Sequence, residues 1–341
     1  MNVIRIGLDI AKQVFQIHGV DTHGKVVLRQ SLSRGKVLAF FANLPACLIG
    51  LEAGGGAHYW GRELTRLGHE VRLIAPPLVV PYRKSGKAGK NDKNDAEAIC
   101  EAVGRPSMRF VPIKSEDQQA VLMLHRAREL AVTERTALVN QIRGLLGEFG
   151  IVVAQGRERL QQALPLLLED AENGLPLLAR ETFAELAERL RIFDHQITAY
   201  DRRLEQLARE REPARRLMTV DGVGPITATA VVATLGDGLE FRNGRQFAAW
   251  LGLTPRQYSS GGKTKLGSIS KRGNSYLRTL LIHGARAVLR LTARRTDQKS
   301  RWAEAVKARR GENIAAIALA AKHARILWAM VTHGEEYRLA A

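Results

Sequence analysis

Hydrophobic runs of strand length alternate with polar turns over residues 3–75. Five short runs of β type are separated by turns, which is typical of strands; they cover residues 3–8, 14–20, 25–32, 47–51 and 71–75. The first three lie close together and the segment 21–24 has hairpin-turn chemistry, so we expect an antiparallel meander. A helical pattern at 57–68 separates the last two and predicts a parallel crossover. The sequence therefore predicts a mixed α/β sheet in an N-terminal domain, residues 1–114.

Helical patterns dominate the chain beyond this sheet. After a basic, glycine-containing connector at 83–90, a helix is predicted over 91–103. The segment 115–149 opens with polar residues suited to capping and predicts one long helix. We expect a helical region at 115–212 and a mainly helical C-terminal domain at 213–341. The predicted fold class is α/β plus α.

A heptad pattern marks the middle of the chain. Its hydrophobic positions recur at alternating spacings of three and four residues: Phe183, Leu186, Leu190, Phe193, Ile197, Tyr200, Leu204 and Leu207. An intramolecular helical hairpin and an intermolecular coiled coil would both bury this seam. Charged residues surround the seam, which leaves one narrow stripe to bury, and this favours the coiled coil at 183–207. A homo-oligomer, either a dimer or a tetramer, is therefore expected.

The balance of charge indicates the kind of partner. Lys and Arg number 52 against 34 Asp and Glu, which gives a formal net charge of +18. Most of this surplus lies in residues 251–310, which contain fifteen basic residues and only two acidic ones. Such a concentration of positive charge is typical of nucleic-acid binding and is hard to explain on an enzyme of small neutral substrates. We therefore expect DNA or RNA as the partner.

Other compartments and site types are disfavoured by composition. Cys47 and Cys100 are the only cysteines, so neither a disulfide framework nor a zinc knuckle is expected. The apolar runs 73–80 and 314–321 are much shorter than the roughly 20 residues that span a bilayer. We therefore expect a cytoplasmic protein without a membrane partner.

Four carboxylates stand at positions where a sheet and a helix bring them together. Asp9 ends the first predicted strand and Glu52 the fourth, so they meet at one edge if these strands are neighbours. Asp92 and Asp95 are three residues apart at a helix start and share one face. Oxygen ligands without His or Cys select Mg²⁺, or alternatively Mn²⁺, and such ions stabilise phosphoryl transfer. Taken singly, an Asp at a strand end is more often a turn residue, and Asp92 is equally suited to an N-cap.

Two glycine-containing motifs follow in the C-terminal domain. The segment 220–225, followed by a helix, is typical of a helix-hairpin-helix-like element in which Gly222 and Gly224 leave backbone N–H groups for phosphate; an ordinary helix-loop-helix stays an alternative. Further on, Ser259 and Ser260 precede two glycines on a predicted flexible loop in a basic segment. Such a setting suits a nucleophilic hydroxyl, although most Ser-Gly-Gly loops are only turns. Phosphate contacts are expected from the surrounding cations: Arg256, Lys263, Lys265, Lys271, Arg272 and Arg278.

These blocks together resemble a known family. The chain contains, in order, Gly-Leu-Asp-Ile-Ala-Lys, Leu-Glu-Ala-Gly, Lys-Asn-Asp-x-x-Asp-Ala, Gly-Val-Gly-Pro-x-Thr-Ala, Arg-Gln-Phe-Ala-Ala-Trp-Leu-Gly-Leu-Thr-Pro and Tyr-Ser-Ser-Gly. This order is similar to that of the DEDD transposases of the IS110 insertion-sequence family. The resemblance extends over nearly the whole chain and is least specific at 152–178.

The resemblance implies a specific chemistry. It implies an RNase H-like, or RuvC-like, N-terminal domain in which Asp9, Glu52, Asp92 and Asp95 coordinate Mg²⁺. It implies that Ser260, which directly precedes Gly261, is the nucleophile of the C-terminal transposase domain. It further implies recombination between element ends and target DNA through 5′-phosphoserine links, guided by a structured noncoding bridge RNA. The expected location is the prokaryotic cytoplasm, at the nucleoid.

Three other functions are compatible with part of the sequence. A metal-dependent RuvC-like junction resolvase would use water as the nucleophile and leave Ser260 a structural role. A tyrosine recombinase is disfavoured because Tyr258 lacks a recognisable Arg, His and Arg frame. A non-catalytic repressor would explain the charge but leave the four carboxylates without a purpose.

Overall fold

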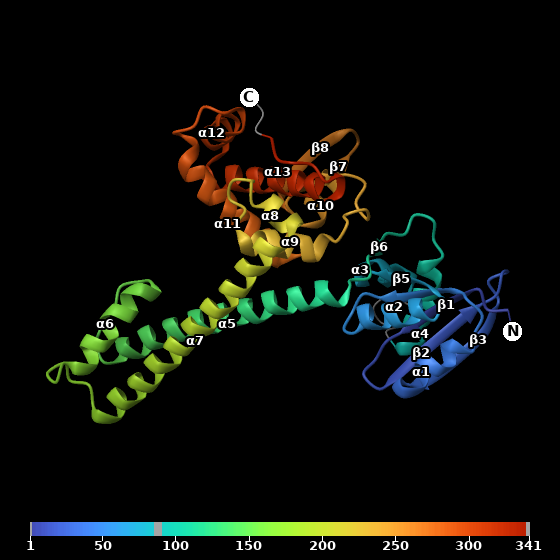
Figure 1. Ribbon diagram of the computed structural model, residues 1–341, viewed down its shortest axis with the longest axis horizontal. Coiled ribbons are helices and arrows are strands. Elements are labelled where there is room, and N and C mark those ends of the chain that lie inside the picture. Colours follow the sequence, from blue (N-terminus) through green and yellow to red (C-terminus); the bar gives the residue numbers. More distant parts are fainter. Residues whose placement is uncertain (1, 85–90, 339–341) are drawn as a thin grey trace. The chain divides into compact units, whose positions relative to one another are not determined.

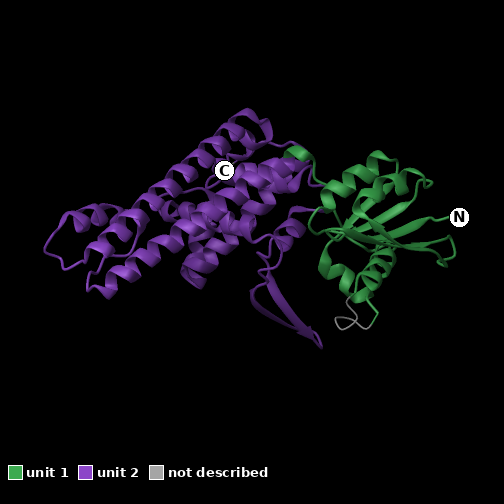
Figure 2. Cartoon of the chain, turned by 90° about the horizontal axis from the view of Figure 1, so that it is seen from below, with its two compact units in different colours: residues 1–117 green, residues 118–341 purple. Residues whose placement is uncertain are grey.

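A computed structural model describes residues 2–84 and 91–338 of the chain. The chain forms two compact units, residues 1–117 and residues 118–341 (Figure 2). The first unit is built on one mixed sheet, and the second is helical apart from a β-hairpin (Figure 1). Most of the predicted connector 83–90 lies outside the described residues.

Unit 1 contains a six-stranded sheet in the order β3-β2-β1-β4-β5-β6. The strands are β1 (Arg5–Asp9), β2 (Val14–Val20), β3 (Val26–Ser33), β4 (Leu48–Glu52), β5 (Glu70–Ile74) and β6 (Phe110–Val111). The first three form an antiparallel meander, and β4 runs parallel to both β1 and β5. The predicted mixed sheet is confirmed and is consistent with a RuvC-like domain. The two-residue strand β6 was not predicted, because it is too short to show a period.

Helices cover both faces of this sheet (Figure 2). They are η1 (Arg34–Lys36), α1 (Val37–Ala42), α2 (Ala57–Arg66), α3 (Pro76–Val79), η2 (Val80–Tyr82) and α4 (Asp92–Val103). The hydrophobic side chains of β1 and β4, such as Leu8 and Leu51, pack in one cluster with side chains of α1 and α2. Side chains alternate between the two faces of a strand. The residues of β1 and β4 on the other face of the sheet therefore face α4.

Two glycines allow α4 to pack closely against the sheet. Gly7 of β1 and Gly50 of β4 are directly paired in the parallel register. A Cβ on Gly7 would lie 2.0 Å from the Ala96 carbonyl oxygen, and one on Gly50 would lie 2.7 Å from Val103 Cβ. A glycine in a strand often marks such a close approach of backbone. The glycine pair thus determines where α4 crosses β1 and β4.

Unit 2 is helical, with one hairpin of β7 (Pro255–Ser260) and β8 (Lys263–Ile269). Its helices are α5 (Glu116–Glu148), α6 (Arg157–Glu169), α7 (Leu177–Glu210), α8 (Glu212–Leu217), α9 (Pro225–Leu235), α10 (Gly244–Trp250), α11 (Ser275–Thr292), α12 (Gln298–Arg310) and α13 (Glu312–His333). The long helix predicted over 115–149 is confirmed as α5.

The heptad seam of α7 is buried within the chain. Seam residues Phe183, Leu190 and Ile197 share a hydrophobic cluster with residues of α5 and α6. The two long helices lie side by side (Figure 1), and Arg135 of α5 pairs with Asp194 of α7 at 2.7 Å. The structure therefore matches the intramolecular alternative, and on this face the preference for an intermolecular coiled coil was wrong. The heptad spacing reveals a buried stripe but not which helix covers it.

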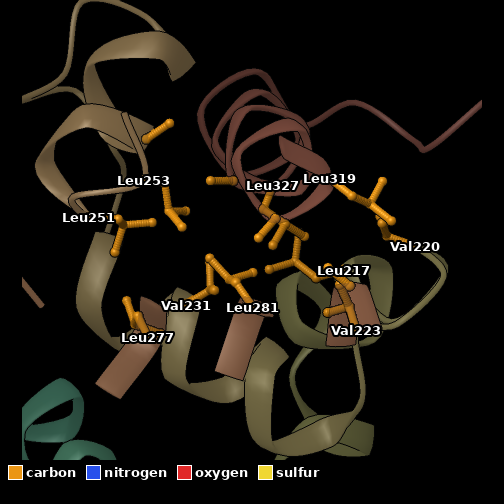
Figure 3. Close-up of a cluster of buried hydrophobic side chains, with 14 of the residues drawn as sticks. Leu217, Val220, Val223, Val231, Leu251, Leu253, Leu277, Leu281, Leu319 and Leu327 are labelled. Carbon is orange, nitrogen blue, oxygen red and sulfur yellow. The ribbon is translucent and has the colours of Figure 1, made fainter. Parts of the chain in front are cut away.

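Helices α8, α9, α11 and α13 contribute to the main core of unit 2 (Figure 3). Among the described residues, α13 is the one helix that is long and apolar enough to cross a membrane by length and composition. The apolar run 314–321 lies within this helix, and Lys322, His323 and Arg325 follow it in the sequence. Half of its apolar window is buried inside the structure, with Leu319 and Leu327 in the core. The helix therefore serves here as a core helix.

A buried histidine joins three helices of unit 2. The His125 ring on α5 lies 3.1 Å from Thr229 Oγ1 of α9 and 3.0 Å from the Tyr276 hydroxyl of α11. Because the Thr229 hydroxyl donates its proton to the Pro225 carbonyl at 2.7 Å, it accepts from His125 Nε2–H, and Nδ1 accepts from Tyr276. Burial, with a smaller effect of Arg128, lowers the pKa of His125 to about 4. A neutral ring is thus part of the folded state.

We expect this histidine to make unit 2 acid-sensitive. Above pH 6.5 the ring is neutral in both folded and unfolded chains; between pH 6.5 and about 4 only the unfolded chain binds the proton. The free energy of unfolding should therefore fall by about 3 kcal/mol over this range, at ~1.4 kcal/mol per pKa unit. Urea unfolding at several pH values should show that the free energy of unfolding changes less with pH in His125→Gln than in the wild type. The exposed His195→Gln variant is the control and should keep the wild-type slope.

Candidate active site

The four predicted carboxylates gather at one end of the sheet of unit 1. Asp9 and Glu52 are the last residues of the adjacent parallel strands β1 and β4. Each stands two residues beyond a glycine that contacts α4, so both lie on the α4 face. Asp92 and Asp95 occupy the first turn of α4, whose N-cap is Asn91 rather than Asp92. The Asn91 side chain accepts a hydrogen bond from the Asn94 N–H at 2.9 Å.

The electrostatics of Asp9 reflect this crowding. Burial raises its pKa most, and the negative charges of Asp95, Asp92 and Glu52 raise it further, to about 6. Only Arg83 acts in the opposite direction among the causes resolved for this group. Carboxylates that repel one another in this way bind a cation favourably. The structure thus brings the four residues within electrostatic reach of one another.

Arg83 lies beside two of these carboxylates and is a site residue that no sequence pattern predicts. Its Nε is 2.5 Å from Asp95 Oδ1, and its Nη2 is 3.5 Å from Glu52 Oε2. The Arg83 side chain is only 10% exposed and that of Asp95 only 8%. Its one signal in the sequence was a place in the basic connector that precedes the carboxylate helix. The sequence gives no period or spacing that would place it against Asp95.

The donor set fits a divalent cation by its chemistry. All four groups are carboxylates, the ligands that Mg²⁺ and Mn²⁺ prefer. The buried Asp95 Oδ1 has no aligned hydrogen bond, although Arg83 Nε is close to it. Over residues 2–84 and 91–338, however, no three His, Cys, Asp or Glu side chains are arranged to hold one ion. Two of the four carboxylates, Glu52 and Asp95, contact the Arg83 guanidinium instead.

The predicted serine lies at the tip of a β-hairpin in unit 2. Ser260 is the last residue of β7 and pairs with Lys263 of β8 across a two-residue turn. Both turn residues, Gly261 and Gly262, have positive φ angles of 55° and 78°, which favour glycine. The expected flexible loop is therefore a hairpin with defined register. The sequence pattern does not predict these strands, because both are exposed along almost their whole length, without alternating burial.

The two adjacent serines have different surroundings. Ser259 Oγ accepts a hydrogen bond of 2.8 Å from the Gln257 side chain. For Ser260, by contrast, the described part of the protein supplies no side-chain hydrogen bond. Alternation along β7 places the two hydroxyls on opposite faces of the hairpin. Ser260 is thus the serine whose hydroxyl is free for an external partner.

Glycines fix the base of this hairpin to the core of unit 2. Gly252 and Gly273 have φ angles of 72°, and a Cβ on Gly273 would lie 1.8 Å from the Trp250 carbonyl oxygen. The Ser270 N–H donates to the Thr254 carbonyl at 2.9 Å, which joins the two strands near their base. The hairpin base is therefore tightly packed, whereas its tip is exposed.

The predicted phosphate-binding cations divide into two groups. Five are exposed on or near the hairpin: Arg256, Lys263, Lys265, Lys271 and Arg272. Arg278 differs, because its Nη1 donates to the carbonyls of Leu251 and Arg272, each at 2.9 Å. That nitrogen supports the fold at the hairpin base. A phosphate contact through the remaining nitrogens of Arg278 stays a prediction.

The predicted glycine element lies between α8 and α9. Gly222 has a φ of 78°, and a Cβ there would lie 2.6 Å from the Gly284 carbonyl oxygen of α11. The adjacent Asp221 pairs with Arg295 at 2.7 Å and Lys299 at 3.0 Å. Gly222 is thus required for close packing on α11. Phosphate binding by Gly222 and Gly224, the N-cap of α9, stays a prediction.

Comparisons with known proteins give matches over both units. A family described as "Transposase IS116/IS110/IS902 family" matches residues 214–301. A second family, the DEDD transposases of IS110, matches residues 6–151. The two matches contain the hairpin serine and the four carboxylates, respectively.

Several relatives match along nearly the whole chain. A "Probable family 20 transposase" of Pseudomonas aeruginosa is 53% identical over 99% of both chains. The "Transposase for insertion sequence element IS1111A" of Coxiella burnetii is 45% identical over 98% of this chain and 92% of its own. The "Transposase for insertion sequence element IS1328" of Yersinia enterocolitica is 40% identical over 98% of both. The similarity therefore extends to both units.

Proposed function

The chain belongs to the IS116/IS110/IS902 family of insertion-sequence transposases, and we propose that it recombines DNA through a covalent link to Ser260. Membership of this family makes it a DNA transposase, and the non-catalytic repressor is no longer an alternative. The proposed reaction is site-specific cleavage and rejoining of element ends and target DNA. The observation that supports serine chemistry most directly is the exposed Ser260 hydroxyl at a hairpin tip.

In the proposed step, Ser260 Oγ attacks the phosphorus of a DNA backbone phosphodiester. A bond forms between Oγ and the 5′ phosphate, the bond to the 3′ oxygen breaks, and the proton lost by the serine is balanced by one gained at the 3′-hydroxyl. The reverse attack by a 3′-hydroxyl on the phosphoserine rejoins strands and releases the serine. The link conserves the phosphodiester bond, so no further co-reactant is needed. Arg256, Lys263 and Lys265 of the same hairpin supply positive charge for the phosphate.

The carboxylates of unit 1 supply the second part of the proposal. Asp9, Glu52, Asp92 and Asp95 would hold Mg²⁺ or Mn²⁺, which when bound stabilises charge on phosphate oxygens. The packing of α4 on Gly7 and Gly50 orients Asp95 toward the strand ends. Support for the metal comes from the donor chemistry and from burial together with carboxylate repulsion, which raise the pKa of Asp9 to about 6.

Partners complete the proposal. We propose DNA and a structured noncoding bridge RNA as ligands, in the cytoplasm at the nucleoid, with the basic segment 251–310 as a binding surface. Exchange of several strands also requires more than one protomer, so a dimer or tetramer is proposed. The seam of α7 is buried within the chain, so a coiled coil between protomers would have to use other residues. The proposed domains are 1–114, 115–212 and 213–341, with a helix-hairpin-helix-like element at 220–225.

The experiment that tests the function looks for protein covalently joined to DNA. The transposase is expressed in cells with the flanking DNA of its element, the cells are lysed in SDS, and DNA-linked protein is detected after nuclease digestion. The expected result is an SDS-stable adduct that requires the element's noncoding region if the bridge RNA is used. Cleavage without any adduct would contradict the proposal. That outcome would favour the alternative, a metal-dependent RuvC-like resolvase in which water attacks, which the carboxylate cluster also supports.

A further inference from the structure

Among the described residues, Arg83 is a cation that contacts the carboxylate cluster. It follows the short helix η2 and is nine-tenths buried beside the equally buried Asp95. Its guanidinium contacts two carboxylates on different elements, Asp95 on α4 and Glu52 at the end of β4. An arginine keeps its charge at any pH of interest, so this positive charge is permanent. Arg83 thus links one carboxylate of the helix, Asp95, with one of the sheet, Glu52.

The contact is electrostatic and not a well-aligned pair of hydrogen bonds. Arg83 Nε and Asp95 Oδ1 are 2.5 Å apart, yet neither atom has an aligned hydrogen-bond partner. The second contact, from Nη2 to Glu52 Oε2, is long at 3.5 Å. A strong arginine–carboxylate pair instead has two parallel, directed bonds. The geometry is therefore that of a replaceable counter-ion.

The charge balance leaves room for a stronger cation. Within the described residues, the Arg83 guanidinium places one positive charge against two carboxylates, Glu52 and Asp95. Within the described ranges, the four carboxylates do not converge in threes on a single point. A divalent ion would need the same oxygens that now face the guanidinium. Two cations at one pair of oxygens repel each other strongly at such distances.

We propose that Arg83 is a counter-ion that competes with the divalent cation for the oxygens of Glu52 and Asp95. The inference rests on the proposed metal-binding role of the four carboxylates. This proposal and a purely structural role of Arg83 predict opposite changes in metal affinity when the arginine is removed. Removing a structural arginine would loosen the site and weaken metal binding, whereas removing a competitor strengthens it.

The test is titration of the full-length protein with Mn²⁺, followed by calorimetry or by the electron paramagnetic resonance of the free ion. We expect Arg83→Gln to bind Mn²⁺ about tenfold more tightly than the wild type. The matched control is Lys84→Gln, which removes the same charge from the next residue, an exposed side chain paired with Glu97. This control should change affinity by less than about twofold. Arg83→Lys keeps the charge and should remain near the wild type.

A melting experiment keeps the inference testable if Arg83→Gln folds poorly. Mn²⁺ should raise the melting temperature of Arg83→Gln more than that of the wild type, because the ion replaces the lost positive charge. Weaker Mn²⁺ binding by Arg83→Gln, or an equal thermal shift, would overturn the competition. A different result is expected if the four carboxylates do not form the metal site. Asp95→Asn would then bind Mn²⁺ with the same affinity as the wild type. If Asp95→Asn abolishes binding while Arg83→Gln leaves it unchanged, only the inference about Arg83 fails.

Discussion

Replacing Ser260 with alanine is expected to abolish the covalent protein–DNA adduct and to lower recombination by about a thousandfold or more. The hydroxyl is the atom that forms the bond to phosphate, and the neighbouring Ser259 points to the opposite face of the hairpin. Recombination and adduct formation are measured in the same SDS-lysed cells. Because residue 260 is exposed, the variant should fold as the wild type does, with an unchanged melting temperature.

The adjacent serine is the matched control for this experiment. Ser259→Ala removes a hydroxyl one residue away, which accepts a hydrogen bond from Gln257, and it should keep the adduct. If instead Ser259→Ala abolishes the adduct and Ser260→Ala keeps it, the nucleophile has been assigned to the wrong serine. Strand cleavage that survives in both variants without an adduct would favour water as the nucleophile.

Replacing Asp9 with asparagine should lower strand cleavage by about a thousandfold while leaving the protein folded. The substitution keeps the size of the side chain but removes one of the charges that a divalent ion needs. It also removes repulsion from Asp95, Asp92 and Glu52, so the melting temperature in the absence of metal should not fall. Cleavage of flanking DNA and thermal melting are measured on the same preparation.

Removal of the metal provides an independent check on this variant. A chelator should reduce the cleavage of the wild type to the level of Asp9→Asn, and added Mg²⁺ should restore only the wild type. The control is Glu101→Gln, which removes a carboxylate of α4 that pairs with Arg105 on the surface. It should cleave normally. Undiminished cleavage by Asp9→Asn would contradict the role of the carboxylates.

Local patterns predicted much of unit 1. Alternation along the strands identified all but the two-residue β6, and the polar start of 91–103 identified α4. The carboxylates were found because each one ends a strand or begins a helix, which is visible in a few residues of sequence. Gly7 and Gly50 carried a further signal, since a glycine within a strand often marks a close approach of backbone.

Patterns were less informative where one strand or helix has several possible partners. The heptad seam at 183–207 was predicted correctly as a buried stripe, but its partner proved to be α5 and α6 of the same chain. The hairpin β7–β8 was read as a loop because its exposed strands lack an alternating pattern. Arg278 was grouped with the phosphate-binding cations, whereas one of its nitrogens binds two carbonyls of the fold.

By itself, the sequence determined the order of the sheet and helical segments, the positions of Asp9, Glu52, Asp92 and Asp95, and the serine before two glycines. These features depend on the spacing of hydrophobic residues and on which residues stand at the ends of strands and helices. Both are local properties of the sequence. The tertiary structure alone placed Arg83 against Asp95, and it alone buried the seam of α7 within the chain. Such contacts join residues far apart along the chain or choose between equally suitable surfaces. These contacts are decided by the packing and burial of the whole unit. No short stretch of sequence contains that information.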